Sequence, residues 1–185
     1  MNTKHQIAVA AVAAGLLTAA LGASAGTLAL TPAANPGMNI GDTLNLQVRG
    51  VGFAETIVGG GFNLGFDASM LRLDSVAIDP IWEFVPDGGT IDNLLGSLTD
   101  ASFNTFANPR TGNFNIATLA FTVIGAGASA VTPGASAFFV WSDPTGNVVS
   151  PDFSGARVTA VPEPSTYGLM ALGLGLLAFG AKRRA

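Results

Sequence analysis

Residues 43–49 read TLNLQVR, and residues 62–66 read FNLGF. In both stretches every second residue is apolar, and the residues between them are polar or glycine. A period of two places one face of an extended strand in the core and the other face in solvent. Both stretches therefore predict β-strands in a sheet that is covered on one face.

Further short strands are expected on either side of these two, at residues 27–31, 71–78, 116–123, 137–141 and 157–161. Between Leu73 and Val76 the apolar phase slips, which indicates a β-bulge. Residues 82–110 are rich in Gly, Asp and Asn and are expected to be irregular, although residues 91–98 are compatible with one or two helical turns. Short alternating strands with turn residues between them predict an all-β fold, a β-sandwich with a closed barrel as the alternative.

The first 25 residues have the pattern of a secretory signal peptide. Lys4 precedes an apolar run from Ile7 to Leu21, and Ala23 and Ala25 are the small residues that a signal peptidase recognises. The run is shorter than the roughly 20 apolar residues of a membrane span. Signal peptidase is therefore expected to cleave after Ala25.

The body that remains, residues 26–160, has a net charge of −7 from four arginines, no lysine and eleven acids. This charge repels phosphate backbones, so nucleic-acid binding is not expected. The chain has no cysteine, and its single histidine, His5, lies in the signal peptide. Thiol chemistry, Cys-ligated metals and a Ser-His-Asp triad are excluded from the body on these grounds.

The last 25 residues, 161–185, differ from the body. Pro162 and Pro164 favour an extended chain, and residues 167–181 then form an apolar run of 15 residues. At about 1.5 Å per residue this run covers roughly 22 Å, which is short of a hydrocarbon core of about 30 Å. Counting from Ser165, and with the basic side chains that follow extended towards the interface, it reaches the lower edge of a membrane span. Basic residues follow it: Lys182, Arg183 and Arg184. These cations and Lys4 predict that both termini face the cytoplasm and that the body faces out.

A Pro-Glu-Pro motif lies directly before the apolar run. Its residues are Val161, Pro162, Glu163, Pro164 and Ser165. The order of motif, apolar helix and basic end resembles the PEP-CTERM sorting signal. This resemblance implies a Gram-negative host with an exosortase, a membrane protease-transpeptidase that recognises the motif and cleaves near it. Proteins with this signal are exported surface proteins, often associated with exopolysaccharide or biofilm. A plain tail anchor is the alternative.

The body carries a second resemblance. Gly41 and Asp42 lead into the strand that ends near Val48, residues 61–73 form a strand followed by an Asp-Ala-Ser turn, and residues 111–123 contain a later strand. Together they resemble the cohesin-like domain, a nine-stranded jelly-roll sandwich related to carbohydrate-binding modules. Two features depart from that pattern: Phe66 stands where a tyrosine is usual, and residues 82–113 have no counterpart. A dockerin partner is therefore not inferred from this resemblance.

Carboxylates are the remaining candidates for chemistry. Asp67 ends a strand and is expected to cap an Asx turn rather than to act in catalysis. Within residues 79–92, Glu83, Asp87 and Asp92 are candidates for a glycosidase, which needs two carboxylates about 5 to 10 Å apart. No cofactor is expected. Calcium is a weak alternative, because oxygen ligands are plentiful but no EF-hand loop is present.

Aromatic side chains outside the clean strands are candidates for sugar binding. Trp82 and Phe84 lie beside Asp79 and Glu83 and form the candidate ligand platform, whereas Trp141 is expected in the core. The sequence predicts three parts: signal peptide 1–25, sandwich 26–160, and sorting signal 161–185. We expect a non-catalytic cell-surface or matrix protein that binds polysaccharide or a surface protein. A secreted hydrolase acting on glycans is the alternative.

Overall fold

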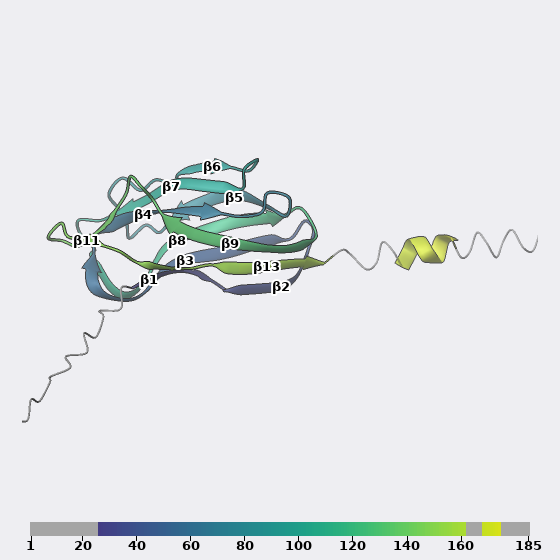
Figure 1. Cartoon of the computed structure of the whole chain (residues 1–185), viewed down its shortest axis with the longest axis horizontal. Helices are drawn as coiled ribbons and strands as arrows, with labels where there is room; N and C mark the ends of the chain where they lie inside the picture. The colour runs from purple at the N-terminus through teal and green to yellow at the C-terminus, as the bar shows by residue number, and fades with distance from the viewer. Residues whose placement is uncertain (1–25, 162–167, 175–185) are drawn as a thin grey trace, which may run out of the picture.

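Two β-sheets packed face to face form the body of the chain (Figure 1). The computed structural model describes residues 26–161 and 168–174. The strands are, in chain order, β1 (Thr27–Thr31), β2 (Ala34–Asn39), β3 (Thr43–Ile57), β4 (Gly59–Gly65), β5 (Leu71–Ile78), β6 (Thr90–Asp92), β7 (Ser97–Asn104), β8 (Arg110–Val123), β9 (Gly127–Ala135), β10 (Trp141–Ser142), β11 (Val148–Val149), β12 (Asp152–Ser154) and β13 (Ala156–Val161). The predicted β-sandwich is confirmed.

The smaller sheet has five strands in the order β12-β1-β3-β8-β5. The larger sheet runs β11-β10-β4-β9-β13-β2, with β7 also paired to β4 and β6 to β7. Two parallel pairings join the beginning and end of the body, β1 with β12 and β2 with β13. Consecutive strands β1 and β2 belong to different sheets, as do β12 and β13, so these segments together close one side of the sandwich.

The alternating stretches place their apolar side chains in the core, as predicted. Leu44, Leu46 and Val48 of β3 are buried, and the polar residues between Leu44 and Val48 are exposed. The predicted irregularity in β5 is present as a register shift between Leu73 and Ser75 in the pairing with β8. Local patterning was sufficient here because the core lies on one face of each strand.

The suggestion of helical turns at residues 91–98 is wrong. This segment forms the hairpin of β6 and β7, and Leu94 and Leu95 are exposed at its tip. The carboxylate of Asp92 accepts the backbone N–H groups of both leucines, which fixes a turn. Gly96 follows at a φ of 68°, and a Cβ there would lie 2.0 Å from the Phe66 carbonyl oxygen. A turn cap and a left-handed glycine therefore replace the helix.

The strand expected at residues 137–141 is also wrong, and β9 was not predicted. The hydroxyl oxygen of Ser136 accepts the N–H groups of Phe138 and Phe139, so the chain turns immediately after β9. Strand β9 is built mainly from Gly, Ala, Ser and Pro, and Val131 and Thr132 are its only two strong strand formers. Its position is decided by the two neighbours that it pairs with, β4 and β13.

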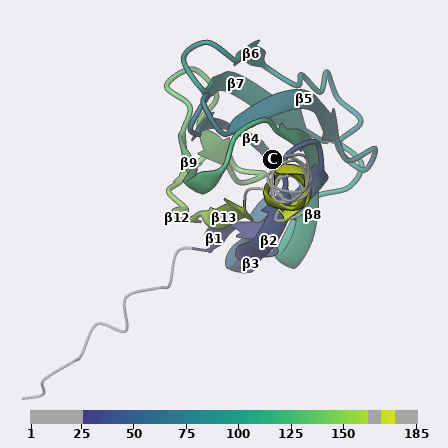
Figure 2. The same cartoon turned by 90° about the vertical axis from the view of Figure 1, so that its right-hand side faces the viewer.

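The sandwich has two opposite ends (Figures 1 and 2). The tail end, where the chain leaves β13, comprises Val161 and the turns at residues 39–42, 67–70 and 124–126. The far end comprises residues 57–59 and the loops 105–109 and 143–147. Residues 168–174 are helical. Within the described ranges, no helix has the length and apolar character needed to cross a membrane.

Candidate functional site

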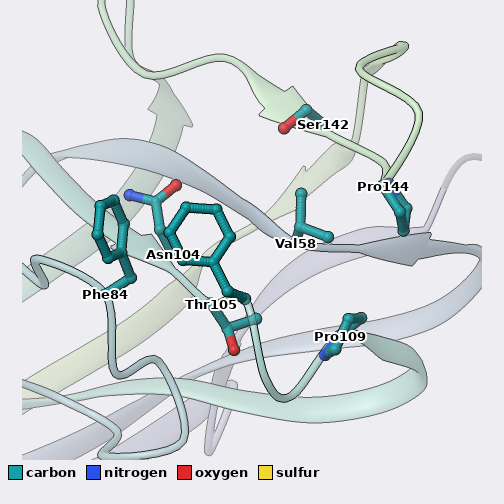
Figure 3. A pocket seen from close by; sticks show the side chains of 8 residues that line it. Val58, Phe84, Asn104, Thr105, Pro109, Ser142 and Pro144 are labelled. Carbon is teal, nitrogen blue, oxygen red and sulfur yellow. The ribbon is translucent and has the colours of Figure 1, made fainter.

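A pocket of about 520 Å³ opens at the far end of the sandwich (Figure 3). It lies between the segment that precedes β6, the loop from β7 to β8, and the hairpin of β10 and β11. The lining side chains are uncharged: Val58, Phe84, Asn104, Thr105, Phe106, Pro109, Ser142 and Pro144. Apolar side chains with a few polar groups among them are typical of ligand-binding pockets.

Two phenylalanine rings dominate one side of this pocket. The ring centroids of Phe84 and Phe106 are 4.3 Å apart, and the ring planes are tilted by 55°. Phe84 is 46% exposed and Phe106 is 76% exposed. Burying such a side chain stabilises a fold by about 1.5–3 kcal/mol, so leaving both rings in solvent forgoes stability. Adjacent exposed aromatic rings beside a pocket are characteristic of binding surfaces.

Glu83 holds the loop that presents Phe106. Its carboxylate accepts hydrogen bonds from the Thr105 hydroxyl at 2.6 Å and from the backbone N–H groups of Phe106 and Ala107 at 2.8 and 2.9 Å. The bond from Thr105, followed by that from Ala107, holds the pKa of Glu83 at about 2. The ionised carboxylate therefore acts as a structural clamp, and the ring of Phe106 is fixed in its exposed position.

Asn104 places an amide group in the pocket beside the two rings (Figure 3). A Cβ on Gly59 would lie 2.1 Å from the Asn104 Oδ1 atom, so only glycine leaves room for this side chain on the neighbouring strand. Within the described part of the chain, neither the Asn104 amide nor the Ser142 hydroxyl has a hydrogen-bond partner. Both groups can therefore bond to a ligand.

The prediction that Trp82 belongs to a ligand platform is wrong. Its side chain is fully buried, and its indole N–H donates to the Asn115 carbonyl oxygen at 2.9 Å. The ring packs edge-on against Phe103 and Phe114. Trp82 is a core residue, as is Trp141, for which the core was expected.

Phe84, the second predicted platform residue, does line the pocket, but its partner Phe106 was missed. The sequence offered one signal, since a large aromatic residue within the turn-rich stretch NTFANP (104–109) has no strand on which to be buried. This signal does not indicate which second ring Phe106 contacts. The contact depends on Glu83, which lies more than twenty residues earlier in the chain.

The three candidate hydrolase carboxylates do not meet at one site, because Asp92 lies far from Glu83. The segment that carries them runs antiparallel to β7, so Asp92 lies beside Ser97 while Glu83 lies beyond Asn104 at the other end of the strand. At about 3.3 Å per residue, Glu83 and Asp92 are roughly 25 Å apart, well beyond the 5–10 Å of a glycosidase pair. Asp87 and Asp92 each accept backbone N–H groups in their own turns.

The remaining predicted positions are the turn at Asp67, a metal site, and the sorting and processing residues. Asp67 Oδ1 accepts the backbone N–H and hydroxyl of Ser69, which is the predicted Asx turn. Over residues 26–161 and 168–174, no group of three or more His, Cys, Asp or Glu residues is arranged to hold a metal ion. Apart from Val161, the sorting and processing residues lie outside the described residues: Ala23, Ala25, Pro162, Glu163, Pro164, Ser165, Lys182, Arg183 and Arg184.

Comparison with protein families identifies the end of the chain. The PEP-CTERM protein-sorting motif matches residues 160–184. The match begins within the last two residues of β13 and continues through the apolar run into the basic cluster. It confirms the resemblance inferred for this segment and indicates an exported protein that is sorted to the cell envelope. No curated protein sequence matches the chain.

Solved structures with the same fold are cohesins. The cohesin module of a family 33 glycoside hydrolase from Clostridium perfringens aligns with a TM-score of 0.61 at 11% identity, covering 76% of this chain and 99% of that one. A type I cohesin in a cohesin–dockerin complex from Clostridium thermocellum aligns at 0.60 and 13%, covering 74% and 99%. A non-cellulosomal cohesin from Archaeoglobus fulgidus gives 0.58 and 13%, covering 77% and 96%. The body is thus a cohesin-like β-sandwich.

Proposed function

We propose that this chain is an exported, non-catalytic protein of the Gram-negative cell surface or extracellular matrix, processed by signal peptidase and then by an exosortase. Its sandwich binds uncharged polysaccharide through the pocket at the far end. The observation that carries this proposal is the pair of exposed rings, Phe84 and Phe106, beside an uncharged pocket of about 520 Å³. The cohesin-like fold supports a binding role by analogy alone.

The position of the pocket suits a displayed binding module. The sorting segment continues from Val161 at the tail end, whereas the pocket lies at the far end (Figure 1). Strand β8 alone contains 14 residues, so at about 3.3 Å per residue the two ends are roughly 40 Å apart. A chain held at its tail end would present the pocket away from the envelope.

The chemistry of the lining favours an uncharged sugar polymer. Aromatic rings stack on the apolar faces of sugars, and the Asn104 amide and Ser142 hydroxyl supply neutral hydrogen-bonding groups. The body carries a net charge of −7, which repels acidic polysaccharides. We therefore expect neutral exopolysaccharide to bind in preference to acidic polymers.

A surface protein is the second candidate partner, because a separate apolar surface lies beyond the β10–β11 hairpin. Phe138 is 79% exposed, and Val140 and Val148, which line one shallow hollow, are exposed as well. One of the similar cohesins was solved in complex with a dockerin, a protein partner. Contacts of this kind would use Phe138 rather than Phe106, which makes the two candidates separable.

Co-sedimentation of the mature chain with the host's own exopolysaccharide tests the proposal. Phe106→Ser removes one ring of the pocket, and we expect it to weaken binding about tenfold, the effect of losing roughly 1.4 kcal/mol. Phe138→Ser is the matched control and should bind as the wild type does. Absence of saturable binding by the wild type would reject polysaccharide as the ligand. Loss of binding in Phe138→Ser alone would place the binding site at the loop between β9 and β10 instead of the pocket.

A further inference from the structure

The sorting segment begins without any linker after the folded body. Val161 is the last residue of β13 and pairs with Asn39 of β2, and Pro162 of the sorting motif follows immediately. The family match even includes the end of the strand, since it starts at residue 160. A membrane or enzyme that binds the sorting segment therefore also keeps the tail end of the sandwich nearby.

The short segment between the folded body and the apolar run limits how far the tail end can lie from a membrane that holds this run. Six peptide units separate Val161 from Tyr167, the first residue of the apolar run. Even fully extended, they span at most about 22 Å. The headgroup zone on one side of a bilayer occupies roughly 6 Å of this distance. The tail end is thus within reach of the lipid surface.

Three apolar side chains surround the point where the chain leaves the sandwich. Ile40 is 47% exposed, Ile124 is 42% exposed and Val161 is 40% exposed. Their backbones are neighbours, because Gly41 donates to the Val123 carbonyl oxygen at 2.8 Å and Val161 pairs with Asn39. Turns at strand ends usually carry polar residues, so β-branched apolar residues at this place lack an explanation in the fold itself.

Charges at the tail end give no attraction to an anionic lipid surface. Asp42 accepts the Asn39 backbone N–H and Asp67 is bonded to Ser69, so both acids are used locally. The nearby cation, Arg72, is paired with Asp74 at 2.7 Å. Contact with lipid would therefore be apolar, shallow and too weak to hold the untethered body, whose net charge is −7.

We propose that Ile40, Ile124 and Val161 rest against the outer face of the lipid bilayer for as long as the sorting segment is inserted in it. This inference rests on the proposed function, in which an exosortase, a membrane enzyme, processes the sorting segment, and on insertion of the apolar run at residues 167–181 into the bilayer. The tether supplies a high local concentration, so three side chains suffice for contact. Cleavage near the Pro-Glu-Pro motif removes the tether, and the body then leaves the surface without a further step.

The absence of native cysteine allows a direct test with the precursor lacking only its signal peptide. Ile40→Cys and Ile124→Cys report the tail end, and Val148→Cys, exposed at the far end, is the matched control. Each variant is labelled with a fluorophore and reconstituted into phosphatidylethanolamine–phosphatidylglycerol vesicles that contain a quencher at headgroup depth. We expect several-fold stronger quenching at both tail-end positions than at Val148.

A second substitution separates apolar contact from mere proximity. With the label at Ile124→Cys, Ile40→Asp should reduce quenching several-fold, whereas Ile40→Val should leave it unchanged. Equal quenching at the two ends, or no effect of Ile40→Asp, would overturn the contact. Failure of the precursor to remain with the vesicles would overturn it together with membrane insertion, and would leave polysaccharide binding, measured separately, unaffected.

Discussion

The far end of the sandwich is packed with a large cluster of aromatic rings, whereas the tail end is closed mainly by aliphatic side chains and tight turns. Five buried rings contact one another near the far end, with centroid distances from 4.7 to 5.6 Å: Phe53, Trp82, Phe103, Phe114 and Trp141. At the tail end one buried pair of rings, Phe66 and Phe121 at 5.3 Å, shares the core with Leu44, Leu71 and Val123. The pocket opens beside the larger aromatic cluster, between the loops 105–109 and 143–147.

The same comparison explains where glycine is needed. At the far end several glycines lie directly under rings: a Cβ on Gly50 would lie 2.3 Å from the Phe114 ring, and one on Gly60 would lie 2.6 Å from the Trp141 ring. At the tail end Gly41 has open space around it but a φ of 96°. Glycine thus provides space beside these two rings and backbone freedom at Gly41.

The largest effect is expected from Trp82→Ala, which removes a fully buried ring from the aromatic end. The cavity and the unpaired Asn115 carbonyl oxygen should lower the free energy of unfolding by about 3–5 kcal/mol. Trp82→Phe retains most of the packing and should cost clearly less. Urea denaturation of both variants measures the difference. A loss below about 1 kcal/mol for Trp82→Ala would show that the aromatic cluster is not the main support of the far end.

Gly60→Ala should come next, because the Trp141 ring cannot move away. This ring is stacked on Phe53 at 5.2 Å, and its indole N–H donates to the Gly61 carbonyl oxygen at 2.9 Å. Overpacking of this kind costs about 1–3 kcal/mol. The control is Gly134→Ala, whose added methyl group meets open space. Equal destabilisation in the two variants, measured by denaturation, would contradict the role assigned to the ring.

At the tail end the corresponding test is Asn93→Ala. The Asn93 side chain accepts the Leu73 N–H at 2.8 Å and donates to the Leu73 carbonyl oxygen at 3.0 Å, so it joins the β6–β7 hairpin to the edge of β5 in the other sheet. Loss of both bonds should lower stability by about 1–2 kcal/mol. Hydrogen exchange should rise at Leu73 while Trp82 stays protected. An unchanged rate at Leu73 would refute this link between the sheets.

Acid should loosen the far end through Glu83. Its folded-state pKa of about 2 lies below the ordinary value of 4.5. The stability that the ionised carboxylate contributes is therefore present above pH 4.5 and is lost as the pH falls towards 2. The protection of the Phe106 and Ala107 amides against hydrogen exchange, measured relative to the intrinsic rate at each pH, should fall over this range. In Glu83→Gln the two amides should exchange faster already at pH 7 and respond less to acid; an unchanged acid response would contradict the clamp.

The smallest effect on stability is expected from Phe106→Ser, because this side chain is mostly exposed. Its removal should change the free energy of unfolding by no more than about 0.5 kcal/mol, although it weakens polysaccharide binding. Thermal denaturation of the variant measures this directly. A large loss of stability would mean that the Phe106 ring is part of the core of the far end. Weaker polysaccharide binding by the variant would then reflect a destabilised fold and not the loss of a ligand contact.

Much of the fold could be predicted because strand patterning is local. Alternation located the strands around Leu46, Leu64 and Leu73, and the phase slip after Leu73 located the bulge. The prediction failed where local composition and tertiary position disagree. Strand β9 has weak strand formers and exists because β4 and β13 lie on either side of it. Residues 91–98 were compatible with helical turns, but a turn capped by Asp92 places the Leu94 and Leu95 side chains in solvent.

The candidate site was only half predictable for the same reason. The sequence identified Trp82 and Phe84 as aromatic residues outside regular strands, and they lie two positions apart. The structure buries the first against Phe103 and exposes the second beside Phe106. Which of two neighbouring rings faces solvent depends on contacts with residues far along the chain.

By itself, the sequence determined the sorting motif at the end of the chain and the layered β-structure of its body. Both are encoded in short, contiguous patterns, a motif before an apolar run in one case and a period of two in the other. Only the tertiary structure decided that Glu83 clamps the loop carrying Phe106, that the pocket lies opposite Val161, and that Asp92 is kept far from Glu83. These facts depend on hydrogen bonds and packing between segments distant in sequence, which no local pattern records.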